Sequence, residues 1–500
     1  MNEHHYVACD LGAESGRILL GTLAGDRLNL EEIHRFPNGP VRVGDSLRWD
    51  TPRIFNELKT GLRQVAERRV PVASVSCDSW GVDYALLGGG RSPEALGLDV
   101  PFHYRDSRTE GALERAFAIL SPEQIFAETG VQFMPINTLY QLLADLRSRR
   151  EMLSSADAFL NIGDYFNFLL SGERKAEESL ASTTQLYNPR TRGWSATLIE
   201  QFGLPARIFP PIVPSGTRLG RLLPALVAET GLKGVQVVAG CSHDTAAAVA
   251  AVPAQGRDWA YLSSGTWSLL GIETAQPILS AHARQYNFTN EVGYGGSIRF
   301  LKNLVGLWIL QECRREWART GQGLSYDALT ELAGKAPPLV SLIDPQEPRF
   351  SRPGEMPGKI AAYCRETSQR APTSPGEFAR CVLESLALMY RRTLDQLEEV
   401  TGKKLTTIHV VGGGSRNELL NQFTANATGR AVLAGPAECT GIGNVLVQAI
   451  ALGHVSSLDA ARRIVRESFP IKRFEPKDVS KWQNAYTQFC ELTDSRVKRG

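Results

Sequence analysis

The sequence predicts an α/β protein with two duplicated lobes and a central cleft between them. Its first 36 residues alternate between apolar stretches (6–10, 17–23 and 28–36) and short turns, which is typical of three consecutive strands. A similar strand–turn–strand pattern returns at residues 259–272, and helical and strand patterns follow both hairpins. Because an internal repeat places two similar units in one chain, we expect a ligand cleft between the lobes.

The length and charge of the chain limit the class of protein. With 500 residues it is too long for one hydrophobic core, so two or three domains are expected. Hydrophobic residues make up 43% and charged residues 22% of the sequence, as is typical of globular proteins. The 55 basic and 53 acidic residues give a formal net charge of +2. This balance provides no general attraction to nucleic acid or to an acidic membrane surface, and neither is an expected partner.

The apolar and cysteine patterns indicate a soluble cytoplasmic protein. Residues 1–12 contain two acidic side chains and no apolar core, unlike a secretory signal. Apolar stretches such as residues 246–254 fall far short of a membrane span. The eight cysteines lack the CxxC or Cys/His spacing typical of zinc sites, and a disulfide framework is not expected in so long a chain. We therefore expect buried thiols and a cytoplasmic location.

Capping residues predict where the main helices begin and end. Thr51 is the expected N-cap of a helix with Pro52 at its first position, and strands are expected at residues 72–77 and 82–87. In the second half, Ser374 and Glu377 form an expected capping box for a long helix that ends at Gly402.

The rest of the second half predicts a strand, a glycine loop and a helix, at residues 407–411, 412–414 and 416–428. Proline and glycine interrupt the apolar pattern at residues 252–258, which is where the lobes are expected to join. The expected domains are therefore an N-terminal lobe, residues 1–251, and a C-terminal lobe, residues 258–500. The last 45 residues, roughly, are expected to be helical, with no lobe assigned to them.

The first loop that can carry chemistry runs from Asp10 to Arg17, between two strands. A Rossmann or P-loop interpretation requires a helix after the glycines, so this position argues against both. A tight hairpin can still present backbone N–H groups and a hydroxyl to a phosphate, and Asp10 can hold a magnesium ion directly or through water. The alternative is an ordinary hairpin turn.

Two further loops contain glycine in the second half. Residues 264–267 (SGTW) form the turn that matches the first loop, so two such turns could hold a triphosphate from both sides. Residues 412–417 (GGGSRN) follow a strand and open a helix, where consecutive glycines allow a nucleotide to approach the backbone closely. A merely structural strand-to-helix turn is the alternative for this loop.

The fourth loop, residues 240–245 (GCSHDT), joins a strand to an alanine-rich helix. It places Asp244 at the positive end of that helix, where a carboxylate facing a cleft can accept a proton from a substrate hydroxyl. The alternatives are that Asp244 is only an N-cap and that His243 only packs or forms hydrogen bonds.

Together these loops resemble the FGGY family of carbohydrate kinases. The matching segments are DLGAESGR (10–17), CSHDTAAAV (241–249), YLSSGTWSLLG (261–271) and HVVGGGSRNELLNQ (409–422), in family order. The resemblance covers nearly the whole chain and implies two ribonuclease H-like lobes, as in actin, hexokinase and heat-shock chaperone ATPases. It also implies that the lobe of residues 1–251 binds the sugar and carries the catalytic base, and that the lobe of residues 258–500 binds the nucleotide. DSWGVDYALL (78–87) and RFLKNLVGLWILQE (299–312) are similar to the branch that phosphorylates L-rhamnulose.

The resemblance also implies roles for individual residues. Asp244 would be the general base for the sugar hydroxyl, and Asp10 the carboxylate associated with Mg²⁺. The expected contacts with ATP are made by Ala13, Ser15, Gly16, Arg17, Thr266, Gln311 and Gly413. The expected contacts with the sugar are made by Gly81, His243, Asp244, Thr245 and Asn303. Glu14 departs from the small residue common in the first loop, so we expect it to point outward or to pair with an arginine.

The expected activity is ATP-dependent phosphorylation of L-rhamnulose at its C1 hydroxyl, with Mg²⁺. One alternative is a related kinase that acts on another ketose, such as L-fuculose or L-ribulose. A non-catalytic nucleotide or sugar sensor on the same fold is a second alternative. The sequence predicts no oligomeric state.

Overall fold

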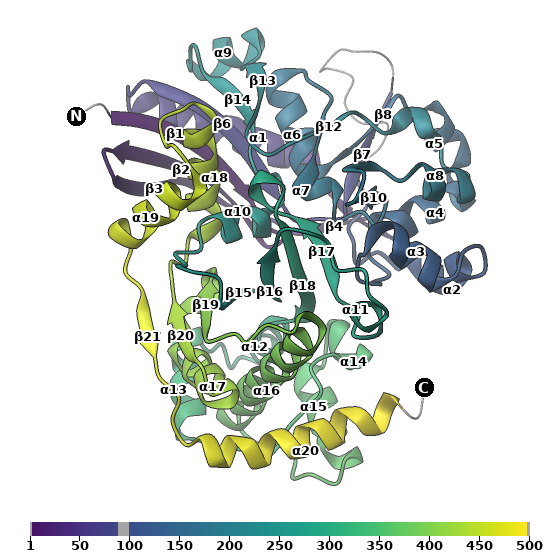
Figure 1. Ribbon diagram of the computed structural model, residues 1–500, viewed down its shortest axis with the longest axis vertical. Coiled ribbons are helices and arrows are strands. Elements are labelled where there is room, and N and C mark those ends of the chain that lie inside the picture. The colour runs from purple at the N-terminus through teal and green to yellow at the C-terminus, as the bar shows by residue number, and fades with distance from the viewer. Residues whose placement is uncertain (1–2, 89–99, 498–500) are drawn as a thin grey trace. The chain divides into compact units, whose positions relative to one another are not determined.

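The structure is a computed structural model that describes residues 3–88 and 100–497 (Figure 1). Its contacts divide the chain into two compact units. Unit 1 comprises Met1–Pro253, Glu273–Phe300 and Cys439–Ser468, and unit 2 comprises Ala254–Ile272, Leu301–Glu438 and Phe469–Gly500. By contacts, two segments of the expected C-terminal lobe therefore belong with unit 1. The domain boundaries expected from the sequence stay a prediction.

Unit 1 is built on a six-stranded sheet in the order β13-β14-β6-β1-β2-β3. β1 pairs antiparallel with β2 and parallel with β6, and β2 pairs antiparallel with β3. The three strands predicted at the N-terminus are thus confirmed. The strands span Glu3–Leu11 (β1), Ser15–Ala24 (β2), Arg27–Pro37 (β3), Val72–Ser79 (β6), Thr217–Arg221 (β13) and Gln236–Ala239 (β14).

Helices from distant parts of the chain cover this sheet. Figure 1 shows α18 and α19, drawn in yellow tones, beside the purple strands β1, β2 and β3, and α18 also packs on α10. The covering helices span Thr51–Glu67 (α1), Ile162–Ser171 (α6), Asp244–Ala250 (α10), Cys439–Ala451 (α18) and Leu458–Ser468 (α19), and Pro224–Thr230 (α9) packs on α1. Asp50, and not Thr51, is the N-cap of α1, because the Asp50 carboxylate accepts the Arg53 N–H at 3.1 Å.

A second hydrophobic cluster in unit 1 forms around β7 and β8, which pair antiparallel. Its elements span Tyr84–Leu87 (β7), Ala112–Phe117 (α2), Pro122–Thr129 (α3), Thr138–Ser148 (α4), Arg150–Ser155 (α5), Ala158–Asn161 (β8) and Ala196–Gln201 (α8). The shorter elements of unit 1 are Pro40–Val43 (β4), Ser46–Trp49 (β5), Ala176–Glu177 (β9), Glu178–Ala181 (α7), Tyr187–Asn188 (β10), Gly193–Trp194 (β11), Ile212–Val213 (β12), Ala281–Gln285 (α11) and Thr289–Val292 (β17).

The second sheet has the order β17-β18-β16-β15-β19-β20-β21. β15 pairs antiparallel with β16 and parallel with β19, β19 pairs parallel with β20, and β20 pairs antiparallel with β21. The strands span Trp259–Ser264 (β15), Trp267–Thr274 (β16), Ile298–Val305 (β18), Thr407–Val411 (β19), Ala431–Ala434 (β20) and Lys472–Phe474 (β21).

The two sheets repeat one topology. In the first sheet, β1 pairs antiparallel with β2 and parallel with β6, and β6 pairs parallel with β14. In the second sheet, β15 pairs antiparallel with β16 and parallel with β19, and β19 pairs parallel with β20. An antiparallel strand then ends the sheet on that side. The predicted duplication of an α/β lobe is confirmed by this correspondence.

The helices of unit 2 follow the predicted pattern with two differences at their starts. They span Trp308–Arg319 (α12), Tyr326–Lys335 (α13), Pro348–Ser351 (α14), Met356–Glu366 (α15), Pro375–Thr401 (α16), Glu418–Thr428 (α17) and Val479–Val497 (α20). Ser374 caps α16 and Gly402 ends it, but the Glu377 carboxylate accepts the Thr373 N–H instead of completing a capping box. α17 starts at residue 418 and not 416, because Asn417 caps it by accepting the Leu420 N–H.

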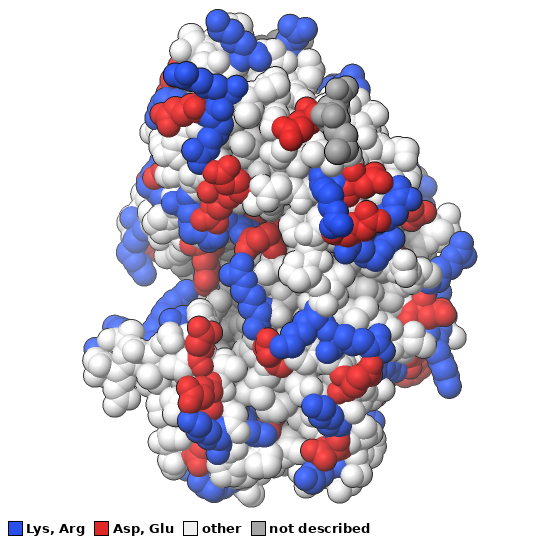
Figure 2. All heavy atoms as spheres, turned by 90° about the vertical axis from the view of Figure 1, so that its left-hand side faces the viewer, with Lys and Arg blue, Asp and Glu red and all other residues white. Residues whose placement is uncertain are grey.

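The surface charge is mixed, as the balanced composition predicts. Figure 2 shows lysine and arginine interspersed with aspartate and glutamate on the face drawn, without a broad region of one sign. Across residues 3–88 and 100–497, no helix combines the length and the apolar character needed to cross a membrane.

Candidate active site

The first predicted phosphate loop is a tight turn between β1 and β2. The Gly12 N–H donates to the Ser15 carbonyl oxygen at 3.0 Å, and Leu11 already pairs with Gly16 across the hairpin. Position 16 requires glycine, because a Cβ there would lie 2.1 Å from the Phe36 ring. A strand follows the turn directly, so a P-loop is excluded as predicted.

Asp10 lies at the end of β1 beside this turn and is only 4% exposed. Its Oδ2 accepts a hydrogen bond from Arg17 Nη2, whereas no residue that the structure describes hydrogen-bonds to Oδ1. Ala13 and Ser15 are half-buried in the loop, and Glu14 is exposed. The outward position expected for Glu14 therefore keeps its carboxylate toward solvent.

Asp244 is the first residue of α10, and His243 is the N-cap. The alternative that Asp244 is the N-cap is therefore wrong. Its Oδ1 accepts the Thr245 N–H at 2.5 Å and the Thr245 hydroxyl at 3.0 Å. Among the described residues, none donates a hydrogen bond to Oδ2. Burial raises the pKa of Asp244 to about 7, and the charge of Asp10 adds to the rise. A carboxylate with a pKa near neutrality suits general base catalysis.

A buried glutamate holds the loop that leads to Asp244. Glu177 Oε2 accepts the Ser242 N–H at 3.0 Å and the Ser179 hydroxyl, which in turn accepts the His243 N–H at 3.2 Å. The Ser215 hydroxyl donates to Glu177 Oε1 at 2.5 Å. These bonds satisfy buried backbone donors and fix the strand-to-helix turn, so Asp244 stands on a rigid support.

Asp78 is a buried carboxyl near Asp10 and Asp244, and its place in the sequence indicates no role for it. It is the register partner of Asp10 across the parallel β1–β6 pair, and Asn444 of α18 donates to its Oδ2 at 2.5 Å. Burial raises its pKa well above the usual range, and the charges of Asp10 and Asp244 add to the rise. The signal in the sequence was an acidic residue ending an apolar strand, as Asp10 does.

The predicted sugar-binding residues of unit 1 lie around the same turn. Ser79 and His243 form an isolated parallel bridge, which brings the end of β6 to the start of α10. Gly81 follows two residues later, and a Cβ there would lie 3.1 Å from the Thr183 hydroxyl. Trp80 is 6% exposed, and its indole N–H donates to Asp83 at 3.0 Å, so it is a core residue.

The predicted nucleotide residues of unit 2 also converge. Thr266 lies in the β15–β16 turn, and Gln311 Nε2 of α12 donates to its hydroxyl at 3.3 Å. The Trp308 N–H at the start of α12 donates to the Thr266 carbonyl oxygen at 3.2 Å. Asn303, the remaining predicted sugar residue, lies in β18 and is half-buried within unit 2.

The triple-glycine loop packs on the strand that precedes this turn. A Cβ on Gly414 would lie 2.1 Å from the Ser264 hydroxyl, and Gly412 has a φ of 82°. A Cβ on Gly413 would meet no atom within 4 Å. The outer two glycines thus serve packing and backbone conformation, whereas Gly413 faces open space, where a ligand can approach the backbone.

The acidic residues do not form a multidentate metal site. Within residues 3–88 and 100–497, no group of three or more His, Cys, Asp or Glu side chains is arranged to hold a metal ion. A single carboxylate fits Mg²⁺ of the kind bound mostly through water and substrate phosphates. Asp10, with Oδ1 unengaged by described residues, fits that role.

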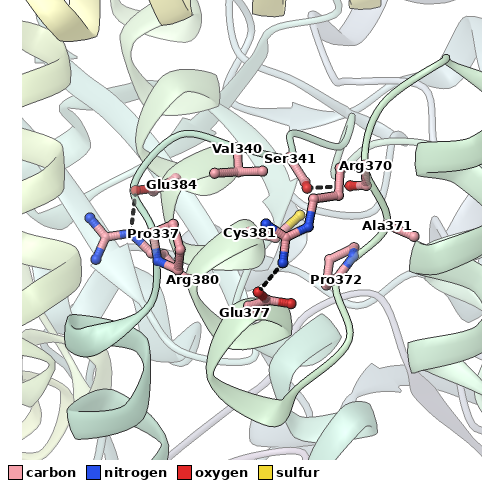
Figure 3. Close-up of a pocket in the computed structure, with 10 residues that line it drawn as sticks. All are labelled: Pro337, Val340, Ser341, Arg370, Ala371, Pro372, Glu377, Arg380, Cys381 and Glu384. Carbon is pink, nitrogen blue, oxygen red and sulfur yellow. Dashed lines mark hydrogen bonds and ion pairs between the residues drawn. The ribbon is translucent and has the colours of Figure 1, made fainter.

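A separate pocket in unit 2 includes none of the predicted site residues. It holds about 270 Å³ of space that opens to solvent. Figure 3 shows that its charged side chains pair with one another, Arg370 with Glu377 and Arg380 with Glu384. These pairs satisfy the charges within the pocket, so we assign it no part in the chemistry.

The chain belongs to the FGGY family of carbohydrate kinases. The family's N-terminal domain model matches residues 98–251, and its C-terminal domain model matches residues 260–452. The duplicated lobes, the paired turns and Asp244 thus belong to an ATP-dependent sugar kinase, with a small-molecule sugar and ATP as substrates.

Within the family, the chain is similar to proteins named rhamnulokinase. It is 42% identical over 487 residues to the rhamnulokinase of Bacteroides thetaiotaomicron, covering 97% of this chain and 99% of that protein. It is also 42% identical to the rhamnulokinase of Enterococcus faecalis, over 97% of each chain.

Solved structures confirm the two-lobed fold of the actin and hexokinase type. A ligand-bound xylulose kinase from Lactobacillus acidophilus superimposes with a TM-score of 0.83 at 16% identity, over 99% of this chain and 98% of that one. Plasmodium falciparum glycerol kinase with ADP superimposes with a TM-score of 0.78 at 15% identity, over the same shares of the two chains.

Proposed function

We propose that this kinase transfers the γ-phosphoryl group of ATP to the C1 hydroxyl of L-rhamnulose. We choose L-rhamnulose as the sugar because the chain is 42% identical, over nearly its full length, to proteins named rhamnulokinase. The choice of reaction is supported by Asp244, a half-buried carboxylate whose Oδ2 is left for a substrate by the described residues.

In this proposal Asp244 accepts the proton of the C1 hydroxyl as its oxygen attacks the γ-phosphorus, and ADP leaves. Gly81, His243, Thr245 and Asn303 orient the sugar by hydrogen bonds. The turns that contain Ser15 and Thr266 donate backbone and hydroxyl hydrogens to the phosphates, with Ala13, Gly16, Arg17, Gln311 and Gly413 completing the ATP site. Donors arranged in this way favour in-line transfer and stabilise the charge that moves onto the leaving group.

The proposal includes Mg²⁺ at Asp10. When bound, the ion neutralises phosphate charge and orients the transferring group. Arg17 holds the Asp10 carboxylate through Oδ2, so that Oδ1 can contact the ion or one of its waters. We also propose that the enzyme acts in the cytoplasm, where ATP is available.

A coupled ADP-release assay over a panel of ketoses and polyols tests the proposal. With Mg-ATP, L-rhamnulose should have the highest kcat/KM. A higher value for L-fuculose or L-ribulose would replace the proposed sugar with that ketose. No ADP release with any sugar would contradict the proposed activity.

A further inference from the structure

A buried ion pair lies behind the imidazole of His243. Arg299, which has no exposed surface, places Nη2 3.0 Å from His243 Nδ1 and 3.2 Å from Glu291 Oε2. Arg299 Nε donates to the Val292 carbonyl oxygen at 3.2 Å, which fixes the guanidinium plane. On the other side of the ring, His243 Nε2 lies 3.4 Å from Asp244 Oδ1.

The chemistry of arginine decides which imidazole nitrogen carries the proton. A guanidinium only donates hydrogen bonds, so the nitrogen it faces at 3.0 Å must be an acceptor. Glu291 Oε2 lies farther from Nδ1, at 3.5 Å, and already pairs with Arg299. A neutral imidazole that accepts at Nδ1 carries its proton on Nε2.

The charge state of the ring agrees with this geometry. Burial lowers the pKa of His243 well below the usual range, and the positive charge of Arg299 lowers it further. His243 is therefore neutral near pH 7, with one proton to place.

We propose that Arg299, held by Glu291, fixes His243 as the Nε2–H tautomer and so makes it a hydrogen-bond donor toward the sugar. Arg299 and Glu291 are then positioning residues, because they act through His243. The inference rests on the proposed function, in which His243 contacts the sugar. It deepens that function by specifying that the sugar atom opposite Nε2 accepts a hydrogen bond.

The same arrangement assigns the basic oxygen of Asp244. Oδ1 faces His243 Nε2 and accepts both the Thr245 N–H and the Thr245 hydroxyl. The two Thr245 donors on Oδ1 leave Oδ2 as the acceptor for the substrate proton. A reversed His243 tautomer would leave a lone pair on Nε2, which cannot donate to the sugar and would repel the nearby Oδ1 of Asp244.

The tautomer can be measured directly in the full-length enzyme. In protein labelled with ¹⁵N-histidine at pH 7, the two ring nitrogens of His243 should show a protonated Nε2 and an unprotonated Nδ1, with His243→Gln identifying the signals. A protonated Nδ1, or protons on both nitrogens, would overturn the inference. This readout needs no catalysis, so it remains decisive if the proposed sugar is wrong.

Variants test the role of Arg299. Arg299→Met removes the donor, so His243 should populate both tautomers and kcat/KM for the sugar should fall about 10-fold or more. The KM for ATP should not change, and Arg299→Lys, which keeps a donor, should recover part of the loss. Arg462→Met is the matched control, because Arg462 is a buried arginine of unit 1 that pairs with Glu273 at 2.6 Å.

Two outcomes for these variants would overturn the role of Arg299. One is a single Nε2–H tautomer retained in Arg299→Met, with the kcat/KM of the wild type. The other is an equal loss of sugar and ATP kinetics in both Arg299→Met and Arg462→Met, because that pattern would indicate general destabilisation.

Discussion

Asp244→Asn tests whether Asp244 acts as the general base of the proposed mechanism or serves only as the first residue of α10. In the wild type, Oδ1 accepts two hydrogen bonds from Thr245. The asparagine carbonyl oxygen should take that place, because only it can accept those bonds. The amide NH₂ then takes the position of Oδ2 and presents a donor to the sugar hydroxyl where the wild type presents an acceptor.

The expected loss follows from this exchange. General base catalysis contributes about 10²–10⁴-fold, so kcat should fall at least 100-fold. The bonds that hold the turn persist, so the melting temperature and the Kd for ATP should stay close to those of the wild type. ADP release at saturating sugar and Mg-ATP measures kcat, and titration calorimetry measures ATP binding.

Asp50→Asn is the matched control, because Asp50 also lies at a helix start in unit 1 and asparagine is an equally good N-cap. It should leave kcat unchanged. If Asp244→Asn also kept a kcat within a few-fold of the wild type, Asp244 would be a structural residue and the mechanism would be refuted.

Further predictions concern pH, metal and the glycine loop. Because the pKa of Asp244 is raised to about 7, the carboxylate becomes protonated below pH 7. We therefore expect kcat/KM to fall about tenfold per pH unit below pH 7 and to level off above it. A profile that is flat from pH 5 to 8 would contradict this. Asp10→Asn should weaken the dependence of activity on Mg²⁺ but leave the Kd for the sugar alone unchanged by calorimetry, whereas lost sugar binding would place Asp10 in the sugar site or the fold. In Gly413→Ala the added Cβ meets no atom within 4 Å, so the variant should raise the KM for ATP at an unchanged melting temperature. In Gly414→Ala the Cβ would lie 2.1 Å from Ser264 Oγ, so the melting temperature should fall. Equal melting temperatures for the two variants would refute this distinction.

Local patterns predicted the elements that place the site. Strands at residues 6–10 and 17–23 follow from apolar stretches beside a short turn, and the structure confirms them as β1 and β2. Asp10 and Asp244 could be singled out because each ends or follows a buried strand. The predicted starts of α1 and α17 were wrong for the same reason. Several residues that can cap a helix are adjacent in each sequence, and the backbone conformation of the turn determines that Asp50 and Asn417 are the N-caps.

The supports of the site depend on contacts between distant residues, which local patterns do not reveal. Asn444 reaches Asp78 from a helix 366 residues later. Arg299 reaches His243 across 56 residues, and Glu177 holds Ser242 across 65. Arg299 lies in an apolar stretch that looks like an ordinary strand until the partner of its charge is known. This is why the sequence indicated the candidate catalytic residues but not the residues that contact and support them.

The most direct test of the account compares kcat/KM for L-rhamnulose with kcat/KM for L-fuculose, L-ribulose, D-xylulose and glycerol, under matched Mg-ATP. A pocket that pairs each hydroxyl rejects the wrong isomer, because a buried polar group left unpaired costs about 1–3 kcal/mol. The account predicts that L-rhamnulose has the highest value, that its product carries phosphate on O1, and that glycerol and D-xylulose are poor substrates. A higher value for any other member of the panel would contradict the assignment of the sugar.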